Sequence, residues 1–365
     1  IWSVTYPSSG LVSFDPATRE FKDYGALHNE NWPQYQRSIA TDDAGWVYFA
    51  IGNTLCQIVA FNPQTNETKT ILPEEERHQG SAVVFSATDG KVYGHAGRTG
   101  EDDWREFHNG EVKNLGKTAT FTERVLITSS QGLFHRDFPD GKKLKTCDLV
   151  ERTLSIEDPK TGETTTNRFD YTSEGAHIMG VAAAPDDTIC GGTAFPMRFF
   201  SYNPKTDTWI NRECYGQWNT IARQGDRFFV GAYSGGYLLE WDPAQPWQAT
   251  KPDDPASNPL LLTQCNEIIG RPHELFAHPD GKTIVLAGTP GYGFTGGGLL
   301  FWNRDTKERI LLEHTAILPD LSTMSLAALP DGKLLGGATV APGTGGETKA
   351  QQAELYIMDI PTKTI

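Results

Sequence analysis

The sequence lacks long apolar runs, which argues against a protein with membrane-spanning helices. No stretch of about 18 consecutive apolar residues occurs, so a membrane-spanning helix is not predicted. The chain begins neither with methionine nor with the basic-then-apolar pattern of a signal peptide, which predicts a soluble protein whose leader has been removed. With 38% apolar and 21% charged residues, the 365-residue chain has the composition of a folded globular protein.

Basic residues are also in short supply. Lysine and arginine number 32 against 46 aspartates and glutamates, which gives a formal net charge of −14. Nucleic acids and anionic membranes need a concentrated basic surface, so neither is an expected partner. An acidic polysaccharide meets the same overall repulsion, but a local cluster of arginines can outweigh distant charges because salt screens them beyond roughly 8 Å.

Cysteines are few, and their spacing excludes the common zinc and redox motifs. The five are scattered without any C-x-x-C pair, and their odd number leaves at least one thiol unpaired. No cluster of metal ligands is visible, and the glycines of "GTPGYGFTGGG" lack the strand-to-helix context and the lysine of a phosphate-binding loop. No metal or other cofactor is therefore predicted.

An internal repeat runs along the whole chain. Each unit has an apolar strand, an Asp-Gly type of turn, a second strand ending in Gly or Ala, a variable loop, a third strand, an Asn/Asp-Pro-x-Thr turn and a fourth strand. The pair "ELFAHPDGKTIVLAG" and "GLLFWNRDTKERILLE" is a clear example. A period of about 40 to 50 residues is typical of propeller blades with four strands.

The repeat predicts an all-β fold, a single β-propeller domain over residues 1–365 with four-stranded antiparallel blades. The count predicts seven blades, with eight as the alternative, because the N-terminal piece looks like a blade without its first strand. The unit near residues 118–171 is irregular. The repeats lie near residues 1–27, 36–74, 80–116, 118–171, 176–214, 217–263, 270–314 and 322–365.

Two histidines in "GRPHELFAHPDGK", residues 270–282, illustrate how a blade separates its two faces. His278 stands in the turn after the first strand, where a solvated turn residue is expected. His273 stands just before that strand, about 16 Å away at ~3.3 Å per residue. Only His273 therefore points to the face on which the variable loops gather.

Other repeats place histidine, arginine and aromatic residues at the same face. First strands of neighbouring blades point at the central axis, so residues distant in sequence come together there, and a functional funnel is predicted. At or near the start of first strands stand Tyr35, Arg37, His78, His177, Trp218, Arg271 and His273. At the exits of second strands stand His95, Arg98, Met197, Arg198, Tyr233 and Tyr292.

These residues also have structural interpretations. A histidine at the start of an inner strand can simply satisfy backbone groups. Arg37 and Arg271 can pair with neighbouring carboxylates such as Asp42 or Glu274, and Trp218 can be plain rim packing. The convergence of all of them on one face favours function.

Histidine, arginine and tyrosine together suit β-elimination from a uronic acid. An arginine neutralises the carboxylate and acidifies the adjacent C–H, a neutral histidine or tyrosine takes the proton, and a second such group protonates the leaving oxygen. The candidate catalytic residues are His78, His177, His273 and Tyr292. The candidate substrate-binding residues are Tyr35, Arg37, His95, Arg98, Trp218 and Arg271, with Trp218 and Tyr292 able to stack on sugar rings.

The stretches "TYPSSGLVSFDPATREFKDYG", "RSIATDDAGWVYFAIG", "RPHELFAHPDGKTIVLAGTPGYGFTGGGLLFW" and "LPDGKLLGGATV" resemble bacterial propeller proteins that act on polysaccharides. Ulvan lyases, rhamnose–glucuronate lyases and the related propeller α-L-rhamnosidases are similar in blade pattern over nearly the whole chain. The resemblance implies roles for His78, His177 and His273 together with Arg37, Arg98 or Arg271. It matches no single position to a family motif, and the structural metal of some ulvan lyases does not carry over.

Three functions follow from the sequence as alternatives. The first is a polysaccharide lyase acting on a uronic-acid-containing glycan, marked by an arginine beside two His or Tyr groups. The second is an exo-glycosidase of the α-L-rhamnosidase type, a glycoside hydrolase that uses a histidine on a rhamnose-containing polysaccharide or oligosaccharide. The third is a non-catalytic propeller that binds a glycan or protein. A polymeric glycan predicts a secreted or periplasmic protein.

Overall fold

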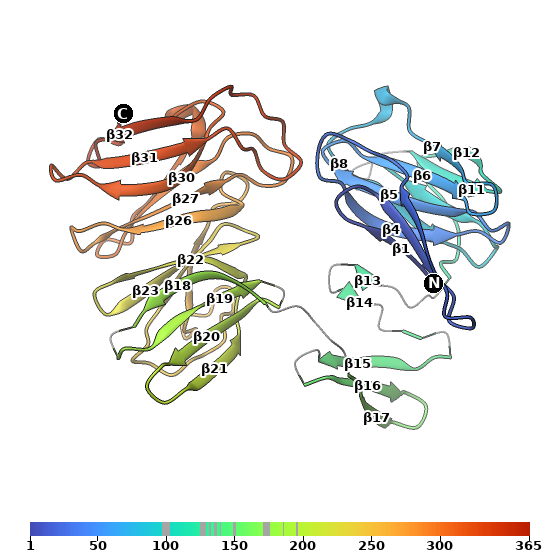
Figure 1. Cartoon of the computed structure of the whole chain (residues 1–365), viewed down its shortest axis with the longest axis horizontal. Helices are drawn as coiled ribbons and strands as arrows, with labels where there is room; N and C mark the ends of the chain where they lie inside the picture. The colour runs from blue at the N-terminus through green and yellow to red at the C-terminus, as the bar shows by residue number, and fades with distance from the viewer. Residues whose placement is uncertain are drawn as a thin grey trace. The chain divides into compact units, whose positions relative to one another are not determined.

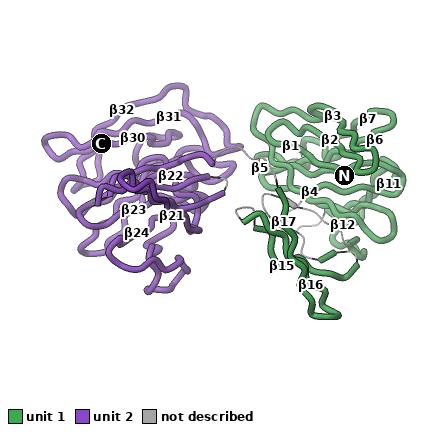
Figure 2. Tube along the Cα trace, turned by 60° about the horizontal axis from the view of Figure 1, so that its bottom comes forward, with its two compact units in different colours: residues 1–174 green, residues 175–365 purple. Residues whose placement is uncertain are grey.

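The computed structural model describes residues 1–96, 103–124, 129–130, 133–134, 137–138, 140–148, 151–170, 176–184, 186–194 and 196–365. It divides into two compact units, residues 1–174 and 175–365, which Figure 2 colours separately. Regular structure in the described residues is almost all antiparallel strand, with two three-residue 3₁₀ helices at Glu74–Glu76 and His314–Ala316. None of the helices described there is long and apolar enough to cross a membrane.

Unit 1 contains five sheets in chain order (Figure 1). The first has β1 (Trp2–Thr5), β2 (Gly10–Phe14) and β3 (Phe21–Ala26). The second has β4 (Tyr35–Thr41), β5 (Val47–Asn53), β6 (Gln57–Asn62) and β7 (Glu67–Thr70), with β8 (Gly80–Ser81) paired to β5. The third has β9 (Val83–Ser86), β10 (Val92–His95), β11 (Trp104–His108) and β12 (Glu111–Gly116). Two smaller sheets follow, β13 (Ser129–Ser130) with β14 (Leu133–Phe134), and β15 (Lys143–Asp148) with β16 (Thr153–Asp158) and β17 (Glu163–Arg168).

Unit 2 contains four sheets. They are β18 (His177–Ala183), β19 (Ile189–Ala194), β20 (Arg198–Asn203) and β21 (Thr208–Glu213); β22 (Gln217–Gln224), β23 (Arg227–Tyr233), β24 (Tyr237–Trp241) and β25 (Leu260–Gln264); β26 (Arg271–Ala277), β27 (Thr283–Thr289), β28 (Gly298–Asn303) and β29 (Arg309–Glu313); and β30 (Ser322–Ala328), β31 (Leu334–Thr339) and β32 (Glu354–Met358). The first strands β18, β22, β26 and β30 pack against one another in series (Figure 1).

Apolar side chains fill the space between consecutive sheets. Phe229 and Leu238 of one sheet pack with Leu286 and Leu300 of the next, all without exposed surface. Each such side chain stabilises the fold by about 1.5–3 kcal/mol. Similar clusters join the other sheets of unit 2 and the first three sheets of unit 1. Four-stranded antiparallel sheets stacked through their faces, with first strands adjacent, are propeller blades.

The turn between the third and fourth strands has the same hydrogen bonds in two blades, one in each unit. In the turn at residues 62–66, Asn62 accepts the backbone N–H of Gln64 on its side chain (2.9 Å) and that of Asn66 on its carbonyl (2.8 Å). Asn66 has a φ of 60°, which an Asn tolerates. The turn at residues 303–307 repeats both hydrogen bonds at 2.9 and 2.8 Å. The side-chain oxygen of the first residue therefore sets the turn.

The predicted all-β fold of antiparallel propeller blades is confirmed, while the single domain and the number of blades stay predictions. Two expectations differ from the structure. The last sheet, expected to have four strands, has three in the described residues, because residues 359–364 form the turn after β32. His278 is 9% exposed rather than solvated, because Gln224 of the neighbouring sheet covers the turn and donates to the His278 carbonyl (2.9 Å).

Candidate functional site

A β-bulge recurs at one position of the first strand in five sheets. In β26, Pro272 pairs with Gly288 and Glu274 with Ala287, so His273 is the extra residue. A bulge re-aims side chains and often lies beside a functional site. The extra residues are Arg37 in β4, Met179 in β18, Asn219 in β22, His273 in β26 and Met324 in β30. Two positions earlier stand Tyr35, His177, Gln217, Arg271 and Ser322, which begin their strands.

Arg271 is the centre of a polar cluster in unit 2. It begins β26 opposite Thr289, and its guanidinium carbon lies 4.6 Å from the ring centroid of Tyr233, at the end of β23. It forms no ion pair with a carboxylate of the described residues, so the expected pairing with Glu274 does not occur. The ring of Tyr233 holds the guanidinium through a cation–π contact. No carboxylate of the described residues therefore neutralises the charge of Arg271.

Tyr233 joins the cluster to the loop after β27. Its hydroxyl and that of Tyr292 share a hydrogen bond, and the two rings meet edge to face with centroids 6.3 Å apart. Gly291, next to Tyr292, donates its N–H to the carbonyl of Glu267 (2.8 Å), which fixes the loop against the turn between β25 and β26. We call Arg271, His273, Tyr233, Tyr292 and Thr289 the Arg271 cluster.

His273 is a neutral base at physiological pH. Burial, followed by the positive charge of Arg271, lowers its pKa to about 4. Its Nε2 lies 3.2 Å from the hydroxyl oxygen of Thr289, which is the cross-strand partner of Arg271. A neutral imidazole beside a guanidinium can accept a proton from a group that the arginine has acidified.

Trp218 cannot stack on a sugar, and that prediction is wrong. Its side chain is 1% exposed and packs on Phe199, with ring centroids 5.3 Å apart. It stands one residue before the bulge of β22, and side chains alternate along a strand, so it faces the core between two sheets. Pro272 in β26 holds the same position and is also buried.

His177 begins β18 opposite Ala194, and its side chain is exposed. It therefore occupies in its sheet the position that Arg271 occupies in β26. Both belong to unit 2.

Tyr35 and Arg37 begin β4 in unit 1. The Arg37 guanidinium lies over the Tyr35 ring (5.2 Å) and donates to the side-chain oxygen of Asn53 (2.6 Å). It forms no ion pair in the described part of the chain, because Asp42, the expected partner, accepts from the hydroxyl of Tyr48 (2.9 Å) and the N–H of Trp46 (2.8 Å). The Arg37 guanidinium thus uses one of its N–H groups on an uncharged partner.

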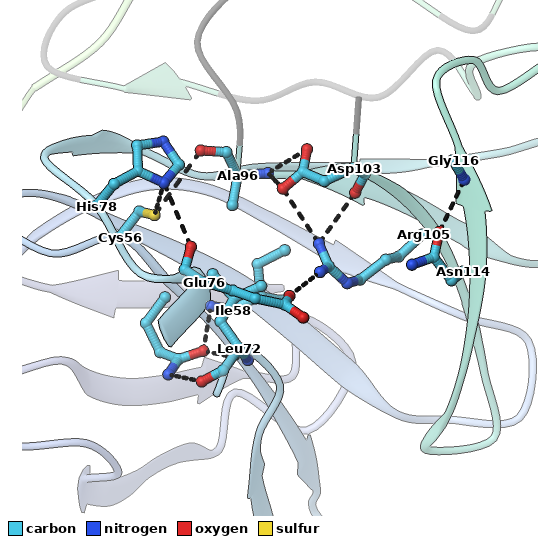
Figure 3. A network of polar contacts seen from close by, with 11 residues as sticks. Cys56, Ile58, Leu72, Glu76, His78, Ala96, Asp103, Arg105, Asn114 and Gly116 are labelled. Atoms are coloured by element: carbon cyan, nitrogen blue, oxygen red, sulfur yellow. Dashed lines mark hydrogen bonds and ion pairs between the residues drawn. The ribbon is translucent and has the colours of Figure 1, made fainter. Parts of the chain in front are cut away.

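His78 lies in a polar network of unit 1 (Figure 3), and His95 lies against an aromatic ring of the same unit. The Nδ1 of His78 lies 3.6 Å from the Cys56 sulfur and 3.3 Å from the Glu76 carbonyl oxygen. The His95 ring packs against Trp104, with centroids 4.5 Å apart. Burial raises the pKa of the Cys56 thiol, so it is a poor nucleophile. Arg98 lies outside the described residues.

Two buried arginines of unit 1 are fully paired. Arg105 binds the carboxylate of Glu76 and that of Asp103 (3.2 Å), which in turn accepts the N–H of Ala96 (Figure 3). Arg77 binds Glu30 at 2.5 Å and Glu74 at 3.0 Å. In such networks the carboxylates neutralise the positive charge of the arginine.

The cysteines and acids give no metal centre. All five cysteines are free, and no group of three or more His, Cys, Asp or Glu side chains in the described ranges is arranged to hold a metal ion. The prediction that residues of both units form one funnel stays a prediction.

Tyr233 is predicted at a strand exit but not as a residue of the site. Thr289 is not predicted at all. Both are the cross-strand partners of first-strand starts, Tyr233 opposite Gln217 and Thr289 opposite Arg271. That pairing is the signal by which they could have been found.

Comparisons with known proteins add distant structural likenesses. No protein-family model matches the sequence, and no curated protein matches it. The structure is similar to a catalytically inactive virginiamycin B lyase from Staphylococcus aureus with quinupristin, at a TM-score of 0.33 and 11% identity over 89% of this chain and 85% of that one. It is similar to the extracellular domain of a putative one-component system from B. thetaiotaomicron (0.34, 12%, covering 100% and 52%) and to the tricorn protease (0.35, 11%, covering 97% and 42%). At these values the likenesses say nothing of activity.

Proposed function

We propose that the protein is a polysaccharide lyase that cleaves a uronic-acid-containing glycan by β-elimination at the Arg271 cluster. The observation that carries the proposal is an arginine with no carboxylate partner among the described residues, beside a neutral histidine and a hydrogen-bonded pair of tyrosine hydroxyls. These are the three kinds of group that the elimination requires.

Arg271 would bind the uronate carboxylate. A guanidinium presents two N–H groups that match a carboxylate, and its charge stabilises the negative charge that develops when the adjacent C–H loses its proton. The contact with Tyr233 presents the guanidinium without neutralising it.

His273 and the tyrosines would move the protons. The imidazole takes the proton from C5 of the uronate, the C5–H electron pair becomes the C4=C5 double bond, and the bond from C4 to the glycosidic oxygen breaks. The tyrosine pair then gives a proton to the departing oxygen, with Tyr292 as the donor, so one proton is taken and one is returned. The pKa of about 4 keeps His273 unprotonated and ready to act at neutral pH.

Another predicted residue enters the proposal as an additional substrate contact. His177 stands in the same unit at a position equivalent to that of Arg271 and would contact a sugar unit beyond the reacting one. Because the substrate is a polymeric glycan, we also propose a secreted or periplasmic location.

Two alternatives are distinguished by their chemistry. An exo-glycosidase acting on a neutral rhamnose has no use for an arginine that lacks a carboxylate partner, so Arg271 disfavours it. A glycan-binding propeller would use Arg271 for recognition but would not need a histidine whose pKa burial holds low.

The test is an assay on a panel of uronate-containing and rhamnose-capped polysaccharides, with Arg271→Met and His273→Ala as variants. The ultraviolet absorbance of the conjugated C4=C5 uronate should rise with the wild type and should fall at least about 100-fold in rate with either variant. His108→Ala is the matched control, because His108 is exposed and paired with Asp43 at 2.8 Å; it should retain full activity.

The other outcomes are equally clear. Release of reducing sugar without the absorbance change would establish a hydrolase. Absence of both signals on every substrate, with retained glycan binding, would establish the binding protein.

A further inference from the structure

A groove lies between the sheet β18–β21 and the connection that leads from β24 to β25. Its volume is about 440 Å³, which is within the range of small-molecule sites. One wall comes from β20 and β21, with Phe199, Ile210 and Arg212, and the other from Trp241 and Trp247. All of these residues belong to unit 2. In the pairing of β20 with β21, Phe199 lies opposite Arg212.

The groove is separate from the Arg271 cluster. Tyr233, which belongs to the cluster, ends β23, whereas Phe228, which stacks on Trp241, lies near the start of β23. Five residues of strand separate them, or about 16 Å at ~3.3 Å per residue. A ligand in the groove therefore does not contact the cluster, and the inference does not depend on the proposed function.

An aromatic framework holds Arg212 in place. Trp247 stacks on Phe199 with ring centroids 4.6 Å apart, and the Arg212 guanidinium carbon lies 5.3 Å from the Trp247 ring centroid. Trp241 stacks on Phe228 at 5.1 Å. These contacts give the groove a rigid apolar wall with one cation fixed against it, so little side-chain entropy is lost when an anion binds.

Arg212 has no carboxylate partner in the described part of the chain, whereas other arginines of unit 2 do. Arg198 lies 3.7 Å from Glu213, and Arg227 lies 3.0 Å from Asp242. The acid that lines the same groove, Asp186, accepts hydrogen bonds from the hydroxyl (2.7 Å) and the N–H (3.1 Å) of Thr188. The groove thus combines apolar walls with a guanidinium that forms no ion pair with a described carboxylate, while the Asp186 carboxylate is held by Thr188.

We propose that this groove binds a small organic carboxylate with a ring-shaped apolar body. The carboxylate would receive two hydrogen bonds from Arg212, as paired guanidinium N–H groups favour. The ring would cover the exposed part of Ile210, which is 47% exposed, and the edges of the two tryptophans. The Arg212 guanidinium favours an anion, and the aromatic walls favour a ring over a flexible chain.

The experiment uses 2-naphthoate as the probe and 2-naphthalenemethanol as its uncharged counterpart. Binding to the full chain is measured by calorimetry and by quenching of tryptophan fluorescence. The wild type should bind 2-naphthoate saturably at one site and at least about tenfold more tightly than the alcohol, a difference of about 1.4 kcal/mol. Arg212→Met, which keeps the length of the side chain but not its charge, should abolish that preference.

Two controls keep the test sharp. Arg223→Met removes an exposed arginine that donates to the Gly225 carbonyl (2.9 Å), and it should leave naphthoate binding unchanged. Ser201→Trp, on the groove wall, should block binding of both probes. The proposal is overturned if the wild type binds no naphthoate, if the acid binds no better than the alcohol, or if Arg212→Met binds naphthoate as well as the wild type.

Discussion

Two arginines of unit 1 and two of unit 2 are held by different kinds of partner. In unit 1, Arg77 and Arg105 are 7% exposed and each binds two carboxylates. In unit 2, Arg271 and Arg212 lie on the rings of Tyr233 and Trp247 and form no ion pair among the described residues. A carboxylate partner neutralises the charge of an arginine. An aromatic ring holds the guanidinium in place without neutralising it, so the charge can still attract an anion. The comparison therefore separates arginines paired with carboxylates from the two that we propose to bind ligands.

The largest effect is expected for a paired arginine. Arg77→Met would remove one of the two partners of Glu30, which also lies 2.9 Å from His28, and the donor that the Cys56 carbonyl accepts from at 3.2 Å. Breaking a buried pair from one side costs about 3–5 kcal/mol, so the free energy of unfolding should fall by that amount. Urea unfolding followed by fluorescence measures it. A loss below about 1 kcal/mol would mean that the pairing does not stabilise unit 1.

Arg271→Met should show the reverse pattern. Its contact with Tyr233 is worth about 0.5–2 kcal/mol, so unfolding should change little. The rate of elimination should fall about 100-fold or more, which is about 2.7 kcal/mol of transition-state stabilisation. Parallel urea unfolding and rate measurements check both. A variant that loses as much stability as Arg77→Met would place Arg271 among the structural arginines.

Arg37 is the intermediate case, because its partner is the uncharged Asn53 at 2.6 Å. Asn53→Ala removes one hydrogen bond to a charged group, which contributes about 1.5–3 kcal/mol. The unfolding free energy should fall within that range, below the loss for Arg77→Met. Asn53→Asp, which supplies a carboxylate, should recover or exceed the wild-type stability; if it destabilises further, the contrast between charged and uncharged partners fails.

A pH dependence due to His273 is expected only below neutral pH. Its pKa of about 4 in the folded protein lies below the ordinary 6.5, so the unfolded chain binds the proton first. Stability from this group is complete above pH 6.5 and is lost as the pH falls towards 4. The unfolding free energy of the wild type relative to His273→Gln should decrease over that interval. A constant difference would show that the histidine titrates normally.

The sequence predicts the blades well because each relies on local signals. Asn62 and Asn303 set their turns with their own side chains, and the Asp-Gly turns need only their neighbours. Trp218 was assigned to the wrong face because one residue of shift along a strand reverses the side chain. The partners of Arg37 and the burial of His278 depend on other sheets, which no local pattern contains.

The site was predictable in part. Arg271 and His273 are predicted because they stand at the start of the first strand of a repeat. Tyr233 joins them only through the contact between neighbouring blades. Whether an arginine meets a carboxylate or a ring is likewise decided by packing between sheets, so composition alone cannot separate Arg77 from Arg271.

The central claim is that Arg271 holds its charge for a carboxylate of the substrate. The most direct measurement is calorimetric binding of a uronate oligosaccharide and of its carboxyl-reduced analogue to the wild type and to Arg271→Met. We predict that the wild type binds the uronate form at least about tenfold more tightly, a difference of about 1.4 kcal/mol, and that the variant binds both forms equally. An equal preference in both proteins, or none in the wild type, would contradict the account.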